Sequence, residues 1–409
     1  MEKIYEVIKN CRLCESTNLK KILDLTDQPP ANSIYKAGDA KPPKVPLKLL
    51  FCNDCSAVQL DSSVDPKYLF SRYVWVTGTS KTAEDHSIFF SKTALKYFNG
   101  STNLRVMEVA SNDGTFLQPF KSNGCEILGV DPAKNIAEEA TRKGIPTIGE
   151  FFSESLANDI VRDKGEQDIV FARNVLPHVK EIHSVVKGIN ISLKNNGLGI
   201  IEFHDAGLIL DELHYDSIYH EHLFLLSLKT ISELLKRYSL FVFDIHKSPI
   251  SGGSWIIFFS KQKKEKSTNL ISAEENDKLR KVDTLQRWEN FASESKKHCL
   301  QLRKTIKQYE GKILAYGASA RSSTLINFCG LSDADISAII DKNPLKHGLL
   351  TPGSNIPIIS FEEGMKFIEK TEIILLLAWN FENEIIQDLR RNGYTGKFIV
   401  PLPNRVTIK

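Results

Sequence analysis

Apolar segments along the chain recur in a strand, tight turn and helix order. Residues 104–110, 126–131, 168–178 and 197–204 contain predicted strands, and residues 81–98 form a predicted helix before the first of them. A tight turn of small residues follows the first strand, at the point where a helix is expected to begin. Strands that alternate with helices in this way predict an α/β fold with a parallel sheet.

The last third of the chain repeats this order after a charged linker at residues 261–266. A single long helix is predicted from about residue 273 to residue 310. A second series follows, with strands at residues 312–316, 336–341, 372–378 and 397–400 and a helix at residues 382–391. This series predicts a separate α/β unit.

Four cysteines near the start form two CxxC pairs, Cys11 with Cys14 and Cys52 with Cys55. Each tight turn can present two sulfurs to one centre, so the spacing predicts a tetrahedral structural zinc site. A redox pair or free thiols are the alternatives. Four thiolates leave no position for a substrate, so the metal is expected to stabilise the fold and to take no part in chemistry.

Length and charge limit the class of protein. The chain has 409 residues, enough for two or three domains, and its 53 basic and 50 acidic residues indicate neither a nucleic-acid nor a membrane partner. The longest apolar run, Ile373 to Trp379, is too short to span a bilayer, and the start lacks the pattern of a signal peptide. We expect a cytoplasmic enzyme with domains at residues 1–75, 76–265 and 266–409.

The turn after the first predicted strand indicates a nucleotide-like ligand. In nucleotide-binding α/β folds this turn lets a ligand approach the backbone, and an acid after the second strand, here Asp131, accepts from ribose hydroxyls. The glycines of a dinucleotide fingerprint are absent, which favours S-adenosylmethionine over NAD because its adenosyl group carries no pyrophosphate. An ordinary α/β domain with a buried Asp131 is the alternative. The candidate cofactor-binding residues are Glu108, Ser111, Asn112, Asp113, Gly114, Asp131 and Asn174.

Proton-transfer groups are concentrated in the stretch Tyr219-His220-Glu221-His222, which we call the catalytic stretch. An imidazole can take a proton near neutral pH, a carboxylate can orient it, and a phenol can donate to a developing oxyanion. Four consecutive side chains in a helix or strand cannot all point one way, so two or three are expected to share a pocket. The alternative is a polar turn before the helix at residues 228–237, with the histidines as caps or surface groups.

Short motifs run through nearly the whole chain beside the paired cysteines. They are Glu108-Val-Ala-Ser-Asn-Asp-Gly, Ala172-Arg-Asn-Val-Leu-Pro-His-Val, Asp216-Ser-Ile-Tyr-His-Glu-His-Leu, Ser251-Gly-Gly-Ser, Ala315-Tyr-Gly-Ala-Ser-Ala, Asp341-Lys-Asn-Pro and Trp379-Asn. With these motifs the chain resembles the sugar C-methyltransferase family, which includes the nucleotide-sugar 3-C-methyltransferases of branched-chain deoxysugar synthesis. The Tyr-His-Glu-His sequence is the most specific of them.

The resemblance implies an N-terminal zinc-binding lobe, a central Rossmann-like S-adenosylmethionine methyltransferase domain and a C-terminal Rossmann-like lobe. It also implies catalysis by the catalytic stretch, with His222 as the base, and by a tyrosine for which Tyr73 is the candidate and Trp75 the alternative. The substrate implied is a nucleotide-diphosphate 4-keto-deoxysugar. A ketone at C4 acidifies the C3–H bond, so His222 could form an enolate, Glu221 could support it, and Tyr219 or His220 could hydrogen-bond the enolate oxygen.

A second turn of small residues in the last third could hold the diphosphate on helix-terminal amides, with Arg321 as a charged clamp. The candidate substrate-binding residues are Gly317, Ser319, Arg321 and Asp341. Arg321 departs from the family, in which relatives often carry Lys, and a lobe that binds nothing is the alternative. His298 and His347 are expected on the surface.

Two other functions stay open at this point. One is an O- or N-methyltransferase that acts on a nucleotide sugar, which would need a base but no donor to a ketone. The other is a non-catalytic zinc-ribbon scaffold whose Rossmann lobes bind ligand without turnover. The sequence specifies no oligomeric state and is compatible with a monomer.

Overall fold

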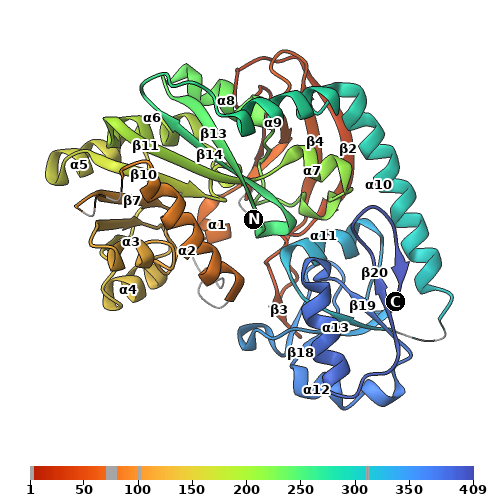
Figure 1. Ribbon diagram of the computed structural model, residues 1–409. Helices are drawn as coiled ribbons and strands as arrows, with labels where there is room; N and C mark the ends of the chain where they lie inside the picture. The colour runs from red at the N-terminus through yellow and green to blue at the C-terminus, as the bar shows by residue number, and fades with distance from the viewer. Residues whose placement is uncertain (1–3, 71–80, 100, 102, 310, 312) are drawn as a thin grey trace.

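The largest sheet has seven strands, in a computed structural model that describes residues 4–70, 81–99, 101, 103–309, 311 and 313–409 (Figure 1). The strands are β7 (Arg105–Val109), β8 (Glu126–Val130), β9 (Thr147–Ile148), β10 (Gln167–Arg173), β11 (Leu193–His204), β13 (Phe241–Ser248) and β14 (Ser254–Ser260). Their order is β13-β14-β11-β10-β7-β8-β9, and β14 runs antiparallel to both of its neighbours. The neighbouring pairs from β11 to β9 are parallel, which confirms the predicted α/β sheet.

Apolar layers cover both faces of this sheet, because successive side chains of a strand point to opposite faces. On one face Phe90 and Phe120 pack against the strand residue Phe171. The helices there are α2 (Lys81–Lys96), α3 (Gln118–Ser122) and α4 (Lys134–Arg142). The other face is covered by α5 (Glu154–Lys164), α6 (Ile182–Ser192) and α8 (Leu228–Arg237). The helices predicted at residues 81–98 and 228–237 are confirmed.

The order in which the chain adds strands to the sheet reverses between β7 and β10. After β7 it adds β8 and β9 on one side, and then returns to add β10 and β11 on the other. In open α/β sheets such a switch point leaves a crevice outside the carboxyl ends of the two strands, where ligands bind. The turns after β7 and β10 therefore lie at the expected ligand-binding opening.

The N-terminal lobe is built on a four-stranded antiparallel sheet. Its strands are β2 (Leu19–Gln28), β4 (Val45–Cys52), β5 (Val58–Leu60) and β12 (Phe224–Leu225), in the order β12-β5-β4-β2. A separate strand pair is formed by β1 (Tyr5–Val7) and β6 (Ser62–Val64), and α1 (Pro66–Phe70) follows. The fourth strand of the sheet comes from the segment just after the catalytic stretch, so the N-terminal lobe and the central domain share a sheet.

The C-terminal lobe is a second α/β unit, as predicted. Its six-stranded sheet has the order β18-β16-β15-β19-β20-β21 and is parallel except for β21. The strands are β15 (Ile313–Tyr316), β16 (Ile336–Ile340), β18 (Ile358–Ile359), β19 (Ile373–Leu376), β20 (Lys397–Val400) and β21 (Thr407–Ile408). The helices are α11 (Ala320–Phe328), α12 (Phe361–Met365) and α13 (Glu382–Arg391). A short pair of β3 (Tyr35–Lys36) with β17 (Leu349–Leu350) ties the lobe to the N-terminal part.

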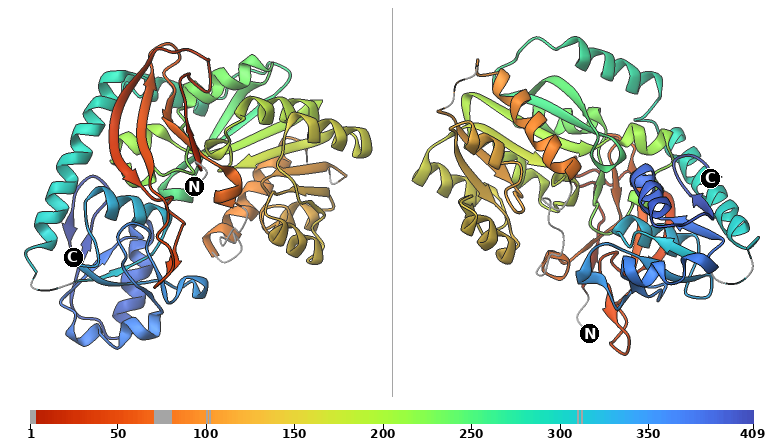
Figure 2. Two further views of the ribbon diagram at one scale, coloured as in Figure 1. Left: turned by 180° about the vertical axis from the view of Figure 1, so that it is seen from behind. Right: turned by 60° about the horizontal axis from the view of Figure 1, so that its bottom comes forward.

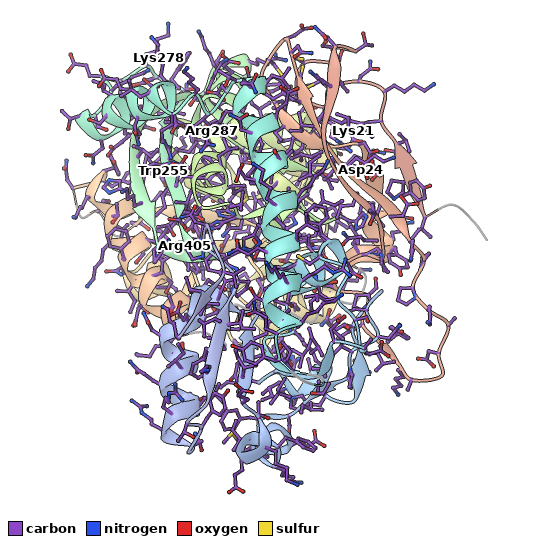
Figure 3. The ribbon with its side chains drawn as sticks, turned by 90° about the vertical axis from the view of Figure 1, so that its right-hand side faces the viewer. Lys21, Asp24, Trp255, Lys278, Arg287 and Arg405 are labelled. Carbon is purple, nitrogen blue, oxygen red and sulfur yellow. The ribbon has the colours of Figure 1, made fainter. Side chains whose placement is uncertain are left out.

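The single helix predicted from about residue 273 to 310 is wrong, because two helices occupy this region. They are α9 (Thr268–Leu279) and α10 (Leu285–Ile306). Lys281 has a left-handed backbone (φ 57°), and the buried Val282 accepts a hydrogen bond from the Trp288 indole at 2.9 Å, so the chain turns between them. The second helix runs along the outside of the molecule from the N-terminal strands to the C-terminal lobe (Figures 2 and 3).

The prediction that His298 lies on the surface is also wrong. This residue of α10 is 3% exposed, and its Nδ1 and Nε2 atoms lie 2.9 Å from the Tyr215 hydroxyl and 2.6 Å from the Pro401 carbonyl oxygen. It shares a face of the helix with the buried Trp288 and Phe291, at helical spacing. His347 is half-buried and bonds to the Asp341 carbonyl oxygen at 2.8 Å.

Replacing His298 with Leu should destabilise the protein, because it leaves the Pro401 carbonyl without its donor. A buried polar group without a partner costs about 1–3 kcal/mol. Urea unfolding followed by tryptophan fluorescence would measure the loss in free energy of unfolding. The control is Lys297→Ala on the exposed face of the same helix, which should change this free energy by less than about 0.5 kcal/mol. Equal stability of the two variants would contradict the packing role of His298.

Candidate active site and metal centre

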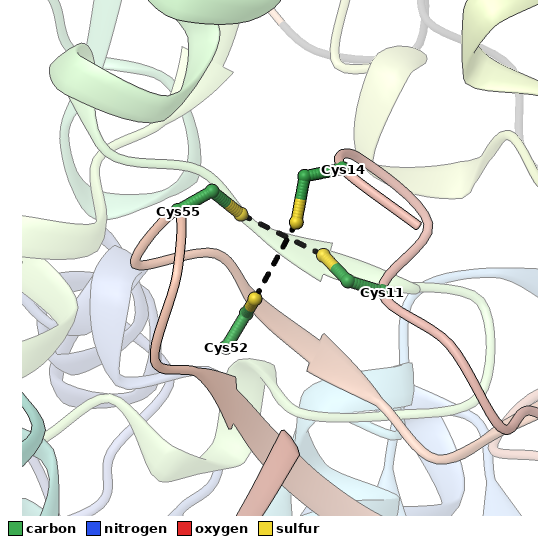
Figure 4. A group of neighbouring side chains, drawn as sticks. All are labelled: Cys11, Cys14, Cys52 and Cys55. Carbon is green, nitrogen blue, oxygen red and sulfur yellow. Dashed lines mark hydrogen bonds between the residues drawn. The ribbon is translucent and has the colours of Figure 1, made fainter. Parts of the chain in front are cut away.

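The Sγ atoms of Cys11, Cys14, Cys52 and Cys55 converge on one point (Figure 4). All four lie within 4.8 Å of one another, and the Cys11–Cys55 and Cys14–Cys52 pairs are both 3.6 Å apart. Zinc bound tetrahedrally at about 2.3 Å from each sulfur would place the sulfurs about 3.8 Å apart. The spacing and the donor set therefore fit a tetrahedral zinc ion.

The two cysteine pairs are held by equivalent backbone turns. The amide of Glu15 donates to the Cys11 carbonyl, and the amide of Ser56 donates to the Cys52 carbonyl, both at 2.9 Å. Glu15 and Ser56 both take the left-handed conformation, with φ values of 64° and 63°. The local sequence thus folds each CxxC into the same turn, and each turn presents two sulfurs.

At the switch point, the turn after β7 closes on Asp131. The two carboxylate oxygens of Asp131 accept from the amides of Asn112 and Ala133, at 2.8 and 2.9 Å. Gly114 has a φ of 79°, and a Cβ atom there would lie 2.7 Å from the Ile145 side chain, so the turn requires glycine. The neighbouring strand ends at Asn174, whose amide donates to the Glu202 carbonyl at 2.7 Å. The predicted cofactor-binding residues therefore lie together at the carboxyl ends of β7, β8 and β10.

Two buried polar atoms at this opening, Glu108 Oε2 and Ser111 Oγ, have no hydrogen-bond partner among the described residues. Burial raises the pKa of Glu108 well above its usual range, and the charges of Asp113 and Asp131 add to this effect while Arg173 opposes it. Acidic side chains and oxygen atoms without hydrogen-bond partners at this turn suit a ligand that brings positive charge and hydrogen-bond donors. The residues present therefore fit the sulfonium, amino group and ribose hydroxyls of S-adenosylmethionine.

A buried charge network behind the opening has no counterpart in the sequence-based predictions. Glu202 accepts hydrogen bonds from Arg173 Nε at 2.7 Å and from the Ser248 hydroxyl, and His86 Nε2 lies 2.9 Å from it. Burial alone would raise the pKa of Glu202, but the Arg173 charge and the His86 and Ser248 hydrogen bonds outweigh it and lower the pKa to about 2. The ionised carboxylate ties α2 to the sheet.

His222 and Tyr219 of the catalytic stretch form a direct pair. The Tyr219 hydroxyl lies 2.7 Å from His222 Nε2, and His222 Nδ1 lies 2.6 Å from the Ser217 carbonyl oxygen. A carbonyl oxygen can only accept, so Nδ1 carries the proton and Nε2 of the neutral ring accepts from Tyr219. Burial, followed by the charge of His178, holds the pKa of His222 well below its usual range.

The other two residues of the catalytic stretch turn toward the N-terminal lobe. His220 Nε2 lies 3.1 Å from the Val45 carbonyl oxygen, and burial lowers the pKa of His220 to about 4. Glu221 accepts a hydrogen bond from the Asn32 amide at 2.6 Å. Burial raises the pKa of Glu221 to about 7, and the Asn32 bond opposes part of this shift. The candidates Tyr73 and Trp75 lie outside the described residues.

The C-terminal lobe contacts Asp216, three residues before the catalytic stretch, through Arg321. Its Nε and Nη2 atoms donate to both carboxylate oxygens of Asp216 at 3.0 and 2.8 Å, and the Trp379 indole donates to the same carboxylate at 2.8 Å. The guanidinium also lies over the Trp379 ring, 4.7 Å from its centroid. Arg321 is thus fixed at the junction between the central domain and the C-terminal lobe. Its role as a clamp for the substrate stays a prediction.

The remaining candidates of the C-terminal lobe form a second opening that repeats the first. The carboxylate of Asp341 accepts from the amides of Ala318 and Asn343 at 2.8 and 2.9 Å. Ser319 caps α11 by accepting from the Ser322 amide, and Gly317 has a φ of 98° that favours glycine. Three of these candidates therefore shape the turn, which leaves their contact with a substrate as a prediction.

Further histidines near His222 had no predicted role, and of these only His178 belongs to a motif quoted above. The His178 and His222 ring centroids are 4.8 Å apart, and His204 Nε2 lies 3.3 Å from His214 Nδ1. Burial lowers the pKa of His178 to about 4 and the pKa of His204 well below its usual range, with the Arg321 charge adding to the shift of His204. These rings form a neutral, buried wall at the junction.

Three family models match consecutive parts of the chain. A model described as “Putative zinc binding domain” matches residues 11–70, and one described as “Methyltransferase domain” matches residues 84–242. A third, described as “C-methyltransferase C-terminal domain”, matches residues 249–403. The first two matches correspond to the N-terminal lobe and the central domain, and the third begins before β14 of the central sheet and extends across the C-terminal lobe.

Similar proteins include a full-length relative. C-methyltransferase NovU of Streptomyces niveus is 28% identical over 413 residues, which cover 98% of this chain and 97% of the relative. A solved S-adenosylmethionine-dependent methyltransferase of Clostridium acetobutylicum ATCC 824 is 12% identical, with a TM-score of 0.35, over 48% of this chain and 95% of that one. Magnesium protoporphyrin IX methyltransferase of Synechocystis PCC 6803 is 14% identical, with a TM-score of 0.33, over 47% of this chain and 88% of that one.

The sheet, the four converging cysteines and the family models define an S-adenosylmethionine-dependent methyltransferase with a structural zinc site. The C-terminal family model and the full-length relative confirm the resemblance of its motifs to those of C-methyltransferases. Its methyl acceptor is therefore carbon, in place of the oxygen or nitrogen kept as an alternative. No helix in the described part of the chain is long and apolar enough to cross a membrane.

Because four thiolates close one metal shell, the purified protein should contain one zinc ion per chain. Cys14→Ser should lower both the zinc content, measured by plasma mass spectrometry, and the melting temperature. Cys125→Ala is the control, since this buried thiol lies outside the cluster and its loss should leave the zinc content unchanged. Full zinc content after all four cysteines are changed to Ser would exclude the site.

Proposed function

We propose that the enzyme methylates C3 of a nucleotide-diphosphate-linked 4-keto-deoxysugar. Transfer to carbon requires a carbon nucleophile, and a ketone at C4 acidifies the neighbouring C3–H bond so that a base can form an enolate. S-adenosylmethionine, when bound at the switch-point opening, supplies a methyl group activated by its sulfonium. The observation that carries the proposal is the Tyr219–His222 pair, which combines an unprotonated imidazole nitrogen with a hydroxyl donor.

In this proposal His222 is the base that removes the C3 proton. The Ser217 carbonyl holds the ring proton on Nδ1, so Nε2 is the unprotonated nitrogen, whose electron pair accepts from Tyr219. The lowered pKa of His222 keeps this nitrogen unprotonated at neutral pH. The same lowered pKa makes His222 a weak base. The negative charge that develops on the substrate would offset this weakness by stabilising the imidazolium.

Tyr219 has two successive partners in this reaction. Its hydroxyl donates to His222 Nε2 at 2.7 Å, and a rotation toward the C4 oxygen would free the electron pair of Nε2. The same rotation would give the enolate oxygen a hydrogen-bond donor. Glu221, whose pKa of about 7 leaves it partly ionised at neutral pH, would support the imidazolium electrostatically.

The charges at the two openings support different ligands for them. Three acids, Glu108, Asp113 and Asp131, interact at the first opening, which suits a cationic donor. At the second opening the Lys346 ammonium lies 3.3 Å from Asp341 and donates to the Ala318 carbonyl at 2.7 Å. Lys346 and Arg321 place two cationic groups on this side, paired with Asp341 and Asp216 respectively, and the substrate diphosphate would bind to these groups.

Replacing His222 with Asn should lower kcat on a nucleotide-linked 4-keto-6-deoxyhexose by about 10²–10⁴-fold, because the amide cannot act as a base near neutral pH. Substrate affinity, measured by calorimetry, should change far less. Tyr219→Phe should lower kcat to a smaller extent, since the ring stays in place. The control is His246→Asn on β13, which should keep wild-type turnover. Near wild-type turnover of His222→Asn, with the methyl group placed on C3 by product NMR, would refute the assignment.

Asp131→Ala should weaken S-adenosylmethionine binding in calorimetry, because the ribose hydroxyls lose their acceptor and the turn loses its closing carboxylate. Asp341→Ala is a matched control, since Asp341 closes the equivalent turn of the other lobe with the same two kinds of amide contact. It should leave S-adenosylmethionine affinity unchanged and weaken binding of the nucleotide sugar. Loss of the same ligand in both variants would show that the two openings are assigned wrongly.

A further inference from the structure

The N-terminal lobe contacts the catalytic stretch and the residue that follows it. His220 lies against the Val45 carbonyl of β4, and the Leu60 amide of β5 donates to the Leu223 carbonyl at 3.0 Å. Strand β12 then continues this contact as an antiparallel partner of β5. The His220 side chain before His222 and the backbone after it are therefore held by β4 and β5, the strands on either side of the second cysteine pair.

Asn32 adds a side-chain contact to this backbone support. It follows β2 in a turn in which the Ser33 amide donates to the Pro30 carbonyl at 3.0 Å. Asn32 itself is exposed, whereas Glu221 is 3% exposed, and the Asn32 amide donates to Glu221 Oε1 at 2.6 Å. The exposed Asn32 side chain thus reaches a buried carboxylate, that of Glu221, which precedes the proposed base His222 in the sequence.

We infer that Asn32 is a positioning residue for methyl transfer, through which the zinc-binding lobe fixes the direction of the Glu221 carboxylate. The inference rests on the proposed function of Glu221 and His222, and it names a residue of the N-terminal lobe as part of the active-site support. A carboxylate on a free side chain can rotate, and a short hydrogen bond from a turn closed at Pro30 restricts it.

The same contact favours the ionised form of Glu221. Burial disfavours the charged carboxylate, and the amide donor from Asn32 acts against burial. Removing the donor should therefore raise the pKa of Glu221 further, so less carboxylate is ionised at neutral pH. If the ionised carboxylate supports the reaction, the activity at and below neutral pH should fall.

The pH dependence of kcat separates this role from a general effect on folding. In Asn32→Ala and Asn32→Asp the acidic limb of the profile should move to higher pH, with kcat below pH 7 lowered on the order of tenfold by the loss of one hydrogen bond to a charged group. Zinc content and KM should stay near wild type. Ser33→Ala is the matched control, because the Ser33 hydroxyl faces Tyr68 at 3.3 Å and should leave the profile in place. An unmoved acidic limb in both Asn32 variants would overturn the inference.

A double-mutant cycle with Glu221→Gln tests whether Asn32 acts through Glu221. Gln does not ionise in this range, so Asn32→Ala should change kcat less than about twofold in that background. An equal loss in both backgrounds would overturn the inference. If Glu221→Gln alone is slow and Asn32→Ala is normal, the inference fails while the proposed function stands. If Glu221→Gln alone has wild-type kcat at every pH, the proposed role of Glu221 fails, and the inference fails with it.

Discussion

The carboxylate of Asp216 is 1% exposed, so the surrounding fold has to supply its hydrogen-bond donors. Both donors, Arg321 and Trp379, come from the C-terminal lobe. Helix α11 therefore has to dock beside the catalytic stretch, and the Thr324 hydroxyl adds a bond to the Ile218 carbonyl at 3.0 Å. Breaking such a buried pair by removing one partner typically costs about 3–5 kcal/mol of stability. The position of His222, six residues after Asp216, therefore depends on the orientation of the C-terminal lobe.

The catalytic stretch is thus held from two sides by parts that are distant in sequence. The N-terminal lobe holds it through β12 and Asn32, and the C-terminal lobe holds it through Asp216. The zinc ion lies outside the chemistry, yet the turn of its second cysteine pair leads directly into β5, the partner of β12. Its stabilisation of the N-terminal lobe therefore supports the backbone that carries the proposed base.

The sequence was sufficient for eight parallel strands of the two α/β units and for the cysteine cluster, because these depend on local spacing, and the motifs indicated the class of enzyme, whereas β13 and β14 had no prediction. The break between α9 and α10 was missed because Lys281 carries no local signal for a left-handed turn. The burial of His298 could have been found from its helical spacing to Trp288 and Phe291. In contrast, the contact of Asn32 with Glu221 spans 189 positions and follows only from how the lobes pack.

Burial keeps the histidines of the junction neutral, with the pKa values of His178, His204 and His222 all lowered. The positive charge of Arg321, which contributes to the shifts of His204 and His222, is balanced by Asp216. A proton taken from the substrate by His222 would therefore add a positive charge to a site of low dielectric constant. In such a site a nearby negative charge stabilises the imidazolium most strongly. In the proposed mechanism the enolate oxygen and the carboxylate of Glu221 are the groups assigned to supply it. Deprotonation is thus expected to depend on their placement more than on the intrinsic basicity of the ring.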